Sequence, residues 1–333
     1  KAIPWIVSLN PAERSFLSVL PDEQGEPKGP QATLSIDESV HQNAQRYFEA
    51  ARKQKDKTKG AVDALEDTML QLQRAQKKEA KQQASGKLNK IKRSKRLWFE
   101  HHRWSMITGG HLLVGGKDAK GNDSIVKKHL SGEDRYLHAD LHGAPSCSLR
   151  ATQGFVVDEH KPAHIPEDIP AFRIVDKLGD ERITDEKLLE AASMALCWSR
   201  AWAGGGAHGT VYSVKPAQVS KTAQTGEFVG KGSFIVRGQR QWFKDLDVQI
   251  GIGIVAVNGV PLLMGGRPET IATTCQRYAI LRPGLTKKEQ LANRIYKNTG
   301  LVTDDVLPVL PGASDILEDY GIFSPPASLA EEE

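Results

Sequence analysis

The sequence predicts an α/β protein of the α+β kind, in which a long coiled-coil helix precedes a mixed, largely antiparallel sheet domain. The chain has 333 residues, 39% of them hydrophobic, which suffices for one large domain or two modest ones with a core. Apolar residues repeat at helical spacing before residue 84, and alternating β patterns replace them from residue 98 onward. We expect residues 1–37 to be the end of a β region, residues 38–97 a basic coiled-coil arm, residues 98–243 a compact domain, and residues 244–333 an α/β extension with an acidic tail.

The first region is expected to hold two short strands. Residues 14–20 and 32–36 have strand character, and the Pro- and Gly-rich stretch 21–30 between them predicts a loop.

A long helix should follow, with Asp37 as its cap. Apolar side chains recur at spacings of three and four, as in a coiled-coil seam: Val40, Ala44, Tyr47, Ala51, then Val62, Leu65, Met69, Leu72. A continuous helix over 38–84 would be about 70 Å long. One amphipathic helix cannot bury its own seam, so we expect a partner helix: the upstream chain, a second copy, or the segment 87–100. The alternative is a solvated face that binds nothing.

The positive charge is concentrated in this arm. Residues 52–96 contain fifteen Lys and Arg against five Asp and Glu, a local balance of +10, whereas the whole chain carries +4 and the remainder therefore −6. A basic arm of this kind attracts polyanions, most simply nucleic acid. Its densest cluster is Lys90, Lys92, Arg93, Lys95 and Arg96.

Beyond residue 98 the pattern predicts alternating strands and helices. In chain order we expect a hairpin at 103–107 and 111–114 across Gly109–Gly110, a short helix at 124–130, a strand at 135–142, an irregular surface loop at 151–183, a helix from Thr184 to Gly204, strands at 211–214, 234–237 and 248–257, a strand–helix–strand unit at 261–282, and a last basic helix at 286–298. The Pro-rich tail after Pro308 is expected to pack loosely.

Cysteine usage and hydropathy bear on the compartment. Cys147, Cys197 and Cys275 are odd in number and far apart, which indicates reduced thiols rather than a disulfide framework. The most apolar run, residues 250–264, is too short and too broken for a bilayer helix. We therefore expect a cytoplasmic protein without membrane contact. Because the chain begins at Lys1 rather than methionine, we expect it to be a piece of a longer protein.

The segment His138-Ala-Asp140-Leu-His142 places three polar side chains on one expected strand face at a spacing of two. Two imidazoles and a carboxylate can bind a metal, act as acid and base in an RNA-processing or RNA-modifying enzyme, or contact phosphate and ribose. The alternative is a hydrogen-bonded histidine pair that shapes a turn.

Two further segments have anion-binding character. Residues 115–123 form a glycine-rich loop containing Lys117, Asp118 and Asn122, where backbone amides can approach an anion, although the P-loop order is absent. An ordinary tight loop is the alternative. Between two later strands lies a basic, hydroxyl-rich rim, beside which Trp104 and Trp242 are candidates for stacking on bases. The rim comprises Ser220, Lys221, Thr222, Thr225, Lys231, Ser233, Arg237 and Arg240. A polar loop on an ordinary domain would look similar. No Ser/His/Asp or Cys/His signature of a nucleophilic enzyme is evident.

Several of these motifs in order resemble the C-terminal RNA-binding (NFACT-R) domain of the NFACT proteins. The resemblance covers residues 98–243 and rests on Arg103-Trp104, Gly115-Gly116-Lys117-Asp118 with Asn122, His138-Ala-Asp140-Leu-His142-Gly143-Ala144, Ala195-Leu196-Cys197-Trp198-Ser199, Gln218-Val219-Ser220-Lys221-Thr222 with Thr225-Gly226-Glu227, and Gly232-Ser233-Phe234 with Arg237-Gly238. Residues 39–48 resemble the entry to the second coiled-coil arm of that family, and 247–298 resemble the extension of its archaeal members.

The resemblance implies ribosome-associated quality control. Such proteins bind stalled large ribosomal subunits that hold peptidyl-tRNA, recruit charged tRNA, and support untemplated extension of the nascent chain, while the ribosome itself forms the peptide bonds. The family's N-terminal domain and first coiled-coil arm are absent from this sequence, and the residues for tRNA engagement lie there. We therefore expect this chain to bind the ribosome without extending peptides.

The partners expected from the resemblance are rRNA of the large subunit, tRNA for the full-length protein, and a coiled-coil partner helix. No cofactor, metal or catalytic residue is predicted. The predicted RNA-binding residues are Lys90, Lys92, Arg93, Lys95, Arg96, Arg103, Trp104, Lys117, Asp118, Asn122, His138, Asp140, His142, Ser220, Lys221, Thr222, Thr225, Lys231 and Arg237.

Overall fold

The computed structural model describes residues 5–84, 88, 96–222 and 229–325. The chain divides into two compact units, Lys1–Lys78 and Glu79–Glu333, so that the boundary falls within the last turns of the long helix.

The first unit consists of a small antiparallel sheet and a long helix. Its strands are β1 (Ile6–Asn10), β2 (Ser15–Val19) and β3 (Gln31–Ser35), in that order in the sheet. Two of them confirm the expected strands, and β1 was not predicted because its five residues carry no clear alternation. The helix α1 (Val40–Ala84) runs without a break for 45 residues, as predicted.

The start of α1 differs from the expectation. Ser39 and Gln42 form a capping box, in which the Ser39 hydroxyl accepts from the Gln42 amide and the Gln42 side chain accepts from the Ser39 amide. Asp37 instead pairs with Arg14 at 2.6 Å. The reason is distance along the chain: Asp37 lies two residues too early to reach the first free amides of the helix.

The apolar seam of α1 is exposed to solvent. Leu65 is 64% exposed and Met69 60%. Part of the segment 87–100, one of the expected partners, belongs elsewhere. Leu88 donates its amide to the Thr299 carbonyl and is buried in the second unit, and Phe99 is fully buried there. Coiled-coil pairing of α1 with a further helix stays a prediction.

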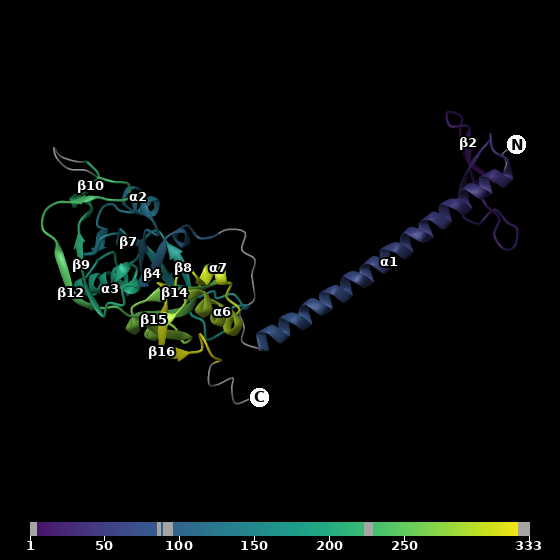
Figure 1. Ribbon diagram of the computed structural model, residues 1–333. Coiled ribbons are helices and arrows are strands. Elements are labelled where there is room, and N and C mark those ends of the chain that lie inside the picture. The colour runs from purple at the N-terminus through teal and green to yellow at the C-terminus, as the bar shows by residue number, and fades with distance from the viewer. Residues whose placement is uncertain (1–4, 85–87, 89–95, 223–228, 326–333) are drawn as a thin grey trace. The chain divides into compact units, whose positions relative to one another are not determined.

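The second unit is built on a mixed, largely antiparallel sheet, which confirms the predicted fold class (Figure 1). The strand order is β12-β9-β6-β7-β8-β13-β15-β16, with β14 beside β13 and the β4–β5 hairpin beside β7. Only the pairing of β8 with β13 is parallel among the described strand pairs. The strands are β4 (Arg103–Ile107), β5 (His111–Gly115), β6 (Arg135–Ala139), β7 (Cys147–Val157), β8 (Ala171–Val175), β9 (His208–Val214), β12 (Gln241–Asp247), β13 (Ile250–Val257), β14 (Val260–Gly266), β15 (Tyr278–Thr286) and β16 (Ser314–Tyr320), and β10 (Val219–Ser220) pairs separately with β11 (Ile235–Val236).

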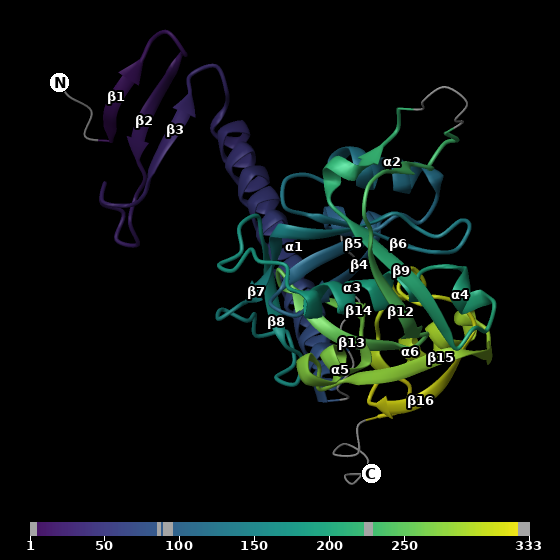
Figure 2. The ribbon, with the colours of Figure 1, turned by 90° about the vertical axis from the view of Figure 1, so that its left-hand side faces the viewer.

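Helices pack against this sheet and contribute side chains to its hydrophobic core. The helix α3 (Asp185–Cys197) packs against β4, β6, β7, β9 and β12, and the turned view shows it among those strands (Figure 2). Its residues Met194 and Leu196 are fully buried in the main hydrophobic core. The other helical elements are η1 (Trp98–His101), α2 (Ala119–Lys128), α4 (Arg200–Ala203), η2 (Pro216–Gln218), α5 (Pro268–Thr274), α6 (Lys288–Thr299) and α7 (Thr303–Val306). Among the described residues, no helix combines the length and apolar character needed to cross a bilayer.

Two predictions about loops are wrong. Residues 151–183 are not one surface loop. The second half of β7 and the whole of β8 fall in this range and belong to the sheet, and Phe155 is buried. The prolines that suggested a loop cluster in the connection, residues 158–170. The tail after Pro308 is also packed: β16 pairs with β15, and Ile322 is fully buried. Its acidic composition concealed a strand because its carboxylates lie toward solvent or cap a turn, as Asp319 does for the amides of Ile322 and Phe323.

Three helix boundaries also differ. The short helix expected at 124–130 is α2, which begins five residues earlier because the Asp118 carboxylate caps it by accepting from the Gly121 amide. The helix expected to run to Gly204 breaks after Cys197 and restarts as α4, where the Ser199 hydroxyl accepts from the Ala201 amide. The expected last helix is α6, and α7 follows it.

The β4–β5 hairpin yields a first prediction. Gly110 has a φ of 85°, and a Cβ there would lie 2.1 Å from the Phe155 carbonyl oxygen. We expect Gly110→Ala to lower the free energy of unfolding by about 2–4 kcal/mol, since it combines a left-handed backbone with a clash in the sheet. Urea titration followed by tryptophan fluorescence measures this. Gly179→Ala is the matched control, because no heavy atom lies within 4 Å of its added Cβ; an equal loss in both variants would contradict the argument.

Candidate nucleic-acid interface

The second unit contains an open cleft with a volume of about 610 Å³. Seven parts of the chain form its walls: the start of β4, the start of α2 with the residues before it, the end of β6 with the turn after it, the break between α3 and α4, strand β9, residues 231–234, and Pro311. The residues that line it include Arg103, Lys117, Asp118, Asn122, Tyr136, His138, His142, Ser146, Trp198, Arg200, Tyr212, Lys231 and Phe234. Seven predicted RNA-binding residues are therefore brought together here.

Asn122 joins three of these walls. Its Oδ1 accepts from the Ser146 amide at 3.0 Å, and its Nδ2 donates to the Gly232 carbonyl at 3.4 Å. Gly116 lies directly beneath it, since a Cβ at that position would be 2.1 Å from the same Oδ1. The glycine-rich segment thus serves close backbone packing, and Asn122 acts as a structural link at the edge of the cleft.

The cleft is strongly cationic. Four cationic side chains line it, those of Arg103, Lys117, Arg200 and Lys231, against the single carboxylate of Asp118. That carboxylate is already engaged as the cap of α2, with a 2.7 Å hydrogen bond from the Gly121 amide. The lining therefore carries an excess of three positive charges with its histidines neutral, which favours an anionic ligand.

Arg103 lacks a countercharge. Burial lowers the pKa of its guanidinium, and within the part of the chain that the structure describes no carboxylate forms an ion pair with it. The neighbouring thiol of Cys147 supplies no charge either, because burial raises its pKa to about 12. Burial, followed by repulsion from Arg103 and Arg96, lowers the pKa of Lys117, whose Nζ donates to the Glu100 carbonyl at 2.9 Å.

An array of rings lies on one side of the cleft. The His138 ring is 6.3 Å from that of Tyr136, at an interplanar angle of 10°, and 5.8 Å from that of Tyr212. The Tyr212 ring is 5.4 Å from Trp242, which is 42% exposed, and the Arg240 guanidinium lies 4.5 Å over Tyr212. Burial lowers the pKa of His138, so its ring is neutral at pH 7. Tyr136 is 2% exposed and Tyr212 7%, so the ring open to a base in the cleft is that of His138, while Trp242 is exposed outside the cleft lining.

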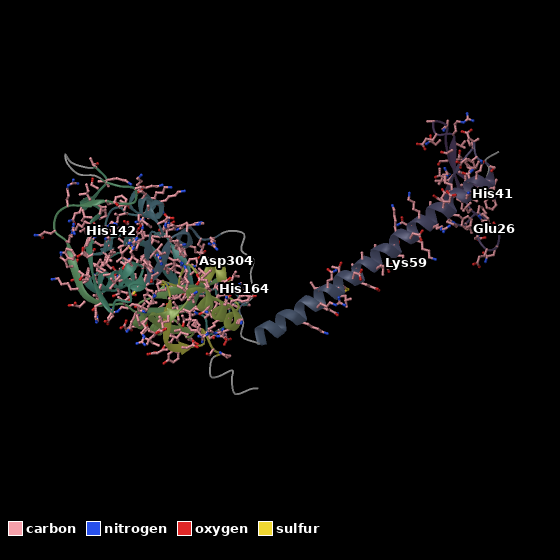
Figure 3. The ribbon with its side chains drawn as sticks, in the orientation of Figure 1. Glu26, His41, Lys59, His142, His164 and Asp304 are labelled. Atoms are coloured by element: carbon pink, nitrogen blue, oxygen red, sulfur yellow. The ribbon has the colours of Figure 1, made fainter. Side chains whose placement is uncertain are left out.

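The predicted face of His138, Asp140 and His142 does not exist as one strand face. Strand β6 ends at Ala139, and the following residues turn, with Gly143 at a φ of 77°. His138 and His142 line the cleft, whereas Asp140 does not (Figure 3 labels His142). No group of three or more His, Cys, Asp or Glu able to hold a metal occurs among the described residues. The expected sharing of one strand face by the three side chains is therefore wrong, because alternation along a strand ends where the strand ends.

The predicted hydroxyl-rich rim lies beside the cleft. Lys221 pairs with Asp123, and its Nζ lies 5.1 Å over the Phe234 ring. The Ser220 hydroxyl accepts from the Thr222 amide at 3.0 Å. Arg237 is half-buried after β11, its amide donating to the Gln218 carbonyl. Of the predicted rim, Lys231 and Ser233 line the cleft itself. Thr225 lies outside the described residues.

Two other predictions concern Trp104 and the basic cluster. Trp104 is only 7% exposed and packs against Phe99, with ring centroids 4.7 Å apart, so it offers no free face to a base and that prediction is wrong. Arg96 forms an ion pair with Asp305 at 3.0 Å. The rest of the cluster, Lys90, Lys92, Arg93 and Lys95, lies outside the described residues.

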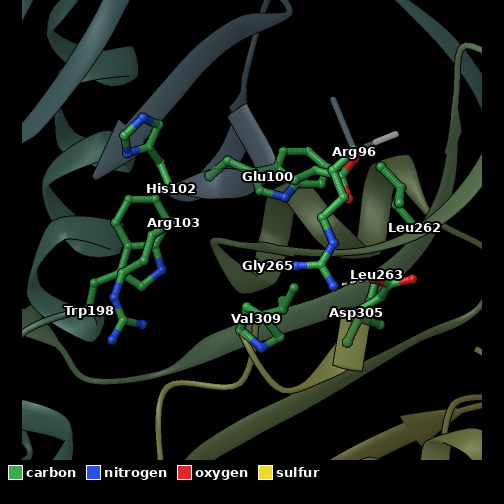
Figure 4. Close-up of a pocket in the computed structure, with 12 residues that line it drawn as sticks. Arg96, Glu100, His102, Arg103, Trp198, Leu262, Leu263, Gly265, Asp305 and Val309 are labelled. Carbon is green, nitrogen blue, oxygen red and sulfur yellow. Dashed lines mark hydrogen bonds and ion pairs between the residues drawn. The ribbon is translucent and has the colours of Figure 1, made fainter. Parts of the chain in front are cut away.

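A second, much smaller cavity lies next to Arg103 (Figure 4). Its volume is about 20 Å³, room for about one water molecule. His102 lines it, and the buried Nδ1 of His102 has no hydrogen-bond partner in the described part of the chain. His102 also contacts His129, which stacks on Trp98 with centroids 4.4 Å apart. The size of this cavity excludes a nucleotide, so the larger cleft is the candidate site.

Sequence reasoning missed several cleft residues. Trp198 and Arg200 lie at the break between α3 and α4, which the apolar spacing did not predict. Tyr212 was expected only as a strand residue, and Phe234 as a strand residue and part of the family motif; neither was predicted to bind RNA. Two signals were available. Ser199 is a common capping residue and could have indicated the break between the helices, and alternation in the strand Val211–Val214 could have indicated the side on which Tyr212 lies.

Comparison with known proteins agrees with this site. The NFACT protein RNA binding domain matches residues 95–238, a range that contains nearly all of the cleft. The second unit therefore includes an RNA-binding domain of this class. The chain belongs to the NFACT family.

Relatives from several organisms support the assignment. The chain is 31% identical over 244 residues to the archaeal Rqc2 homolog aRqcH of Methanocaldococcus jannaschii, covering 72% of this chain and 32% of that protein. It is 30% identical to the Drosophila melanogaster ribosome quality control complex subunit NEMF homolog (70% of this chain, 21% of that protein) and 30% identical to human NEMF (65% and 18%). The chain thus spans a third or less of the length of these relatives.

One solved structure also aligns: the C-terminal part of the fibronectin/fibrinogen-binding protein from Streptococcus suis, at 18% identity and a TM-score of 0.30, over 62% of this chain and 77% of that one. A likeness of this size supports no conclusion about fold or function.

The histidines near the smaller cavity yield a pH prediction. Burial, aided by the positive charges of His102 and Arg150, lowers the pKa of His129 from 6.5 to about 4. Between these values the unfolded chain binds more protons than the folded one, so stability must fall as pH drops from about 6.5 to about 4. We expect His129→Gln to flatten the dependence of Tm on pH in that window, as measured by calorimetry. His160→Gln, at an exposed histidine, is the control; identical pH profiles of wild type and His129→Gln would contradict the assignment.

Proposed function

We propose that this chain is the RNA- and ribosome-binding part of a ribosome quality control factor. It binds stalled large ribosomal subunits that carry peptidyl-tRNA and supports untemplated C-terminal tailing of their nascent chains. The ribosome forms the peptide bonds, so the chain acts as a binding module, and it works in the cytoplasm.

The observation that carries the proposal is the match of residues 95–238 to the NFACT protein RNA binding domain. The names of the relatives, which are ribosome quality control subunits, give the process. The cationic cleft and the basic segment 52–96 supply the charge that binding to rRNA phosphates requires.

The helix α1 provides a second contact surface in this proposal. Its exposed seam, which includes Val62, Leu65 and Met69, pairs with a partner helix, either an upstream arm of the full-length protein or a second copy. tRNA is bound by the full-length protein rather than by this segment alone. The alternative, an RNA-processing or RNA-modifying enzyme, would use His138, Asp140 and His142 as metal ligands or as acid and base; Asp140 lies outside the lining of the cleft.

The test is co-sedimentation of the full chain with purified large ribosomal subunits at several salt concentrations. We expect binding whose logarithm falls linearly with the logarithm of salt concentration. A variant with Lys90, Lys92, Arg93 and Lys95 changed to Glu should bind at least about tenfold more weakly, because it repels the phosphates that the wild type neutralises. Arg96 is left unchanged because its reversal would break the ion pair with Asp305.

A matched control reverses four exposed cations elsewhere in the second unit: Arg173, Arg282, Lys287 and Lys297. It changes the net charge equally and should retain most of the binding. Equal losses of affinity in both variants would show that binding depends on net charge and not on this cluster. An affinity that does not change with salt concentration would show that phosphate contacts do not drive binding.

A further inference from the structure

We propose that the cleft binds one unpaired nucleotide of an RNA strand, with its phosphate between Arg103 and Lys117 and its base against the rings of His138 and Phe234. This inference rests on the proposed function, since it names the form of RNA that the domain takes. It adds a defined pocket to what would otherwise be a diffuse basic surface.

The phosphate end follows from the uncompensated charge. Arg103 and Lys117 both line the cleft. A guanidinium largely removed from water, with no carboxylate paired to it among the described residues, is costly, and the ammonium of Lys117 adds repulsion. A phosphate placed between them would relieve both costs, because it accepts two parallel hydrogen bonds from a guanidinium and a further one from an ammonium. Arg200 and Lys231, both exposed at the rim, extend the same potential toward neighbouring phosphates of a strand.

The base end follows from the rings. Phe234 is half-buried and lines the cleft, and His138 on β6 also lines it, with a neutral ring. Ring faces of this kind stack on a nucleobase whatever its identity, so the site should tolerate all four bases. Neutral His138 can also exchange a hydrogen bond with a base edge or a 2′-hydroxyl.

The form of the cleft selects an unpaired nucleotide. Its volume of about 610 Å³ falls in the range of single small-molecule sites. It is walled by α2 on one side and by the turn at Gly143 on another, where the Arg200 guanidinium lies 3.3 Å from the position of an added Cβ. A base held in a duplex is stacked and paired and cannot enter such a pocket, whereas a base in a loop or at an end can be splayed into it.

The experiment measures binding of the full chain to a fluorescent single-stranded RNA dodecamer by anisotropy. The same strand annealed to its complement, and a strand of equal length with abasic sites throughout, serve as comparison ligands. We expect the single strand to bind at least about tenfold more tightly than either, since only the single strand offers an unstacked base to the rings.

Two variants test the phosphate end. Arg103→Gln with Lys117→Gln should weaken single-strand binding at least about tenfold and reduce the slope of log affinity against log salt by about 0.7, as expected when one phosphate is no longer neutralised. Because Arg103 is largely buried, the exposed pair Arg200→Gln with Lys231→Gln provides a second, milder variant with the same direction of effect. The matched control, Arg282→Gln with Lys287→Gln, removes two exposed cations outside the cleft and should leave both values unchanged.

Phe234→Ala tests the base end. It should weaken binding of the normal strand and leave the abasic strand unaffected, which a merely structural role of Phe234 would not do. Competition with adenosine monophosphate distinguishes an RNA strand from a free nucleotide as the ligand. We expect the free nucleotide to displace the strand only weakly, and this result would support the proposal. Tight binding of the free nucleotide without strand binding would overturn it.

The outcomes also separate this inference from the proposed function. If the cleft variants bind the dodecamer like wild type, or if duplex and single strand bind equally, the pocket proposal fails even when the chain co-sediments with ribosomal subunits. If the chain binds neither RNA nor ribosomal subunits, both proposals fail together.

Discussion

Strand β13 holds the second unit together. All eight of its residues are buried. One edge pairs with β14 along nearly its whole length, and the other edge is shared, with β15 along its first half and β8 along its second. The parallel pairing of Ala256 and Val257 with β8 connects the strands that form the cleft to the strands that follow it in sequence. A region resembling a separate extension therefore belongs to the same sheet as the RNA-binding segment.

The sheet fixes the backbone positions of polar residues that line the cleft. Arg103 opens β4 and Tyr136 and His138 lie on β6, so their backbones are fixed by the sheet. The loops that complete the walls are tied by the hydrogen bonds of Asn122. A scaffold of this kind can keep a desolvated guanidinium that pairs with no carboxylate among the described residues, because burial of a large hydrophobic core offsets the cost. The excess positive charge of the cleft therefore serves ligand binding and does not stabilise the fold.

Sequence reasoning succeeded where the signal is local. The uninterrupted α1, the β4–β5 hairpin, the Thr184 cap of α3 and the strand–helix–strand unit around α5 each depend on spacing or on a cap within a few residues. It failed for β7, β8 and β16, whose strand character depends on partners far along the chain. Proline and acidic residues near these strands suggested loops, but non-local pairing outweighed local preference.

For the site, the sequence by itself determined which segments carry the chemistry: the basic arm, the Gly115–Asn122 segment, the His138 strand and the cations from Lys221 to Arg237, in an order that resembles one family. Only the tertiary structure decided which side chains meet. It buried Trp104 in the core, ended β6 before Asp140, moved the hydroxyl-rich rim beside the cleft, and brought Arg200 and Phe234 into it. The physical reason is that a side chain's direction depends on where its strand or helix ends and on what packs against it, and both are settled by contacts between residues far apart in the sequence.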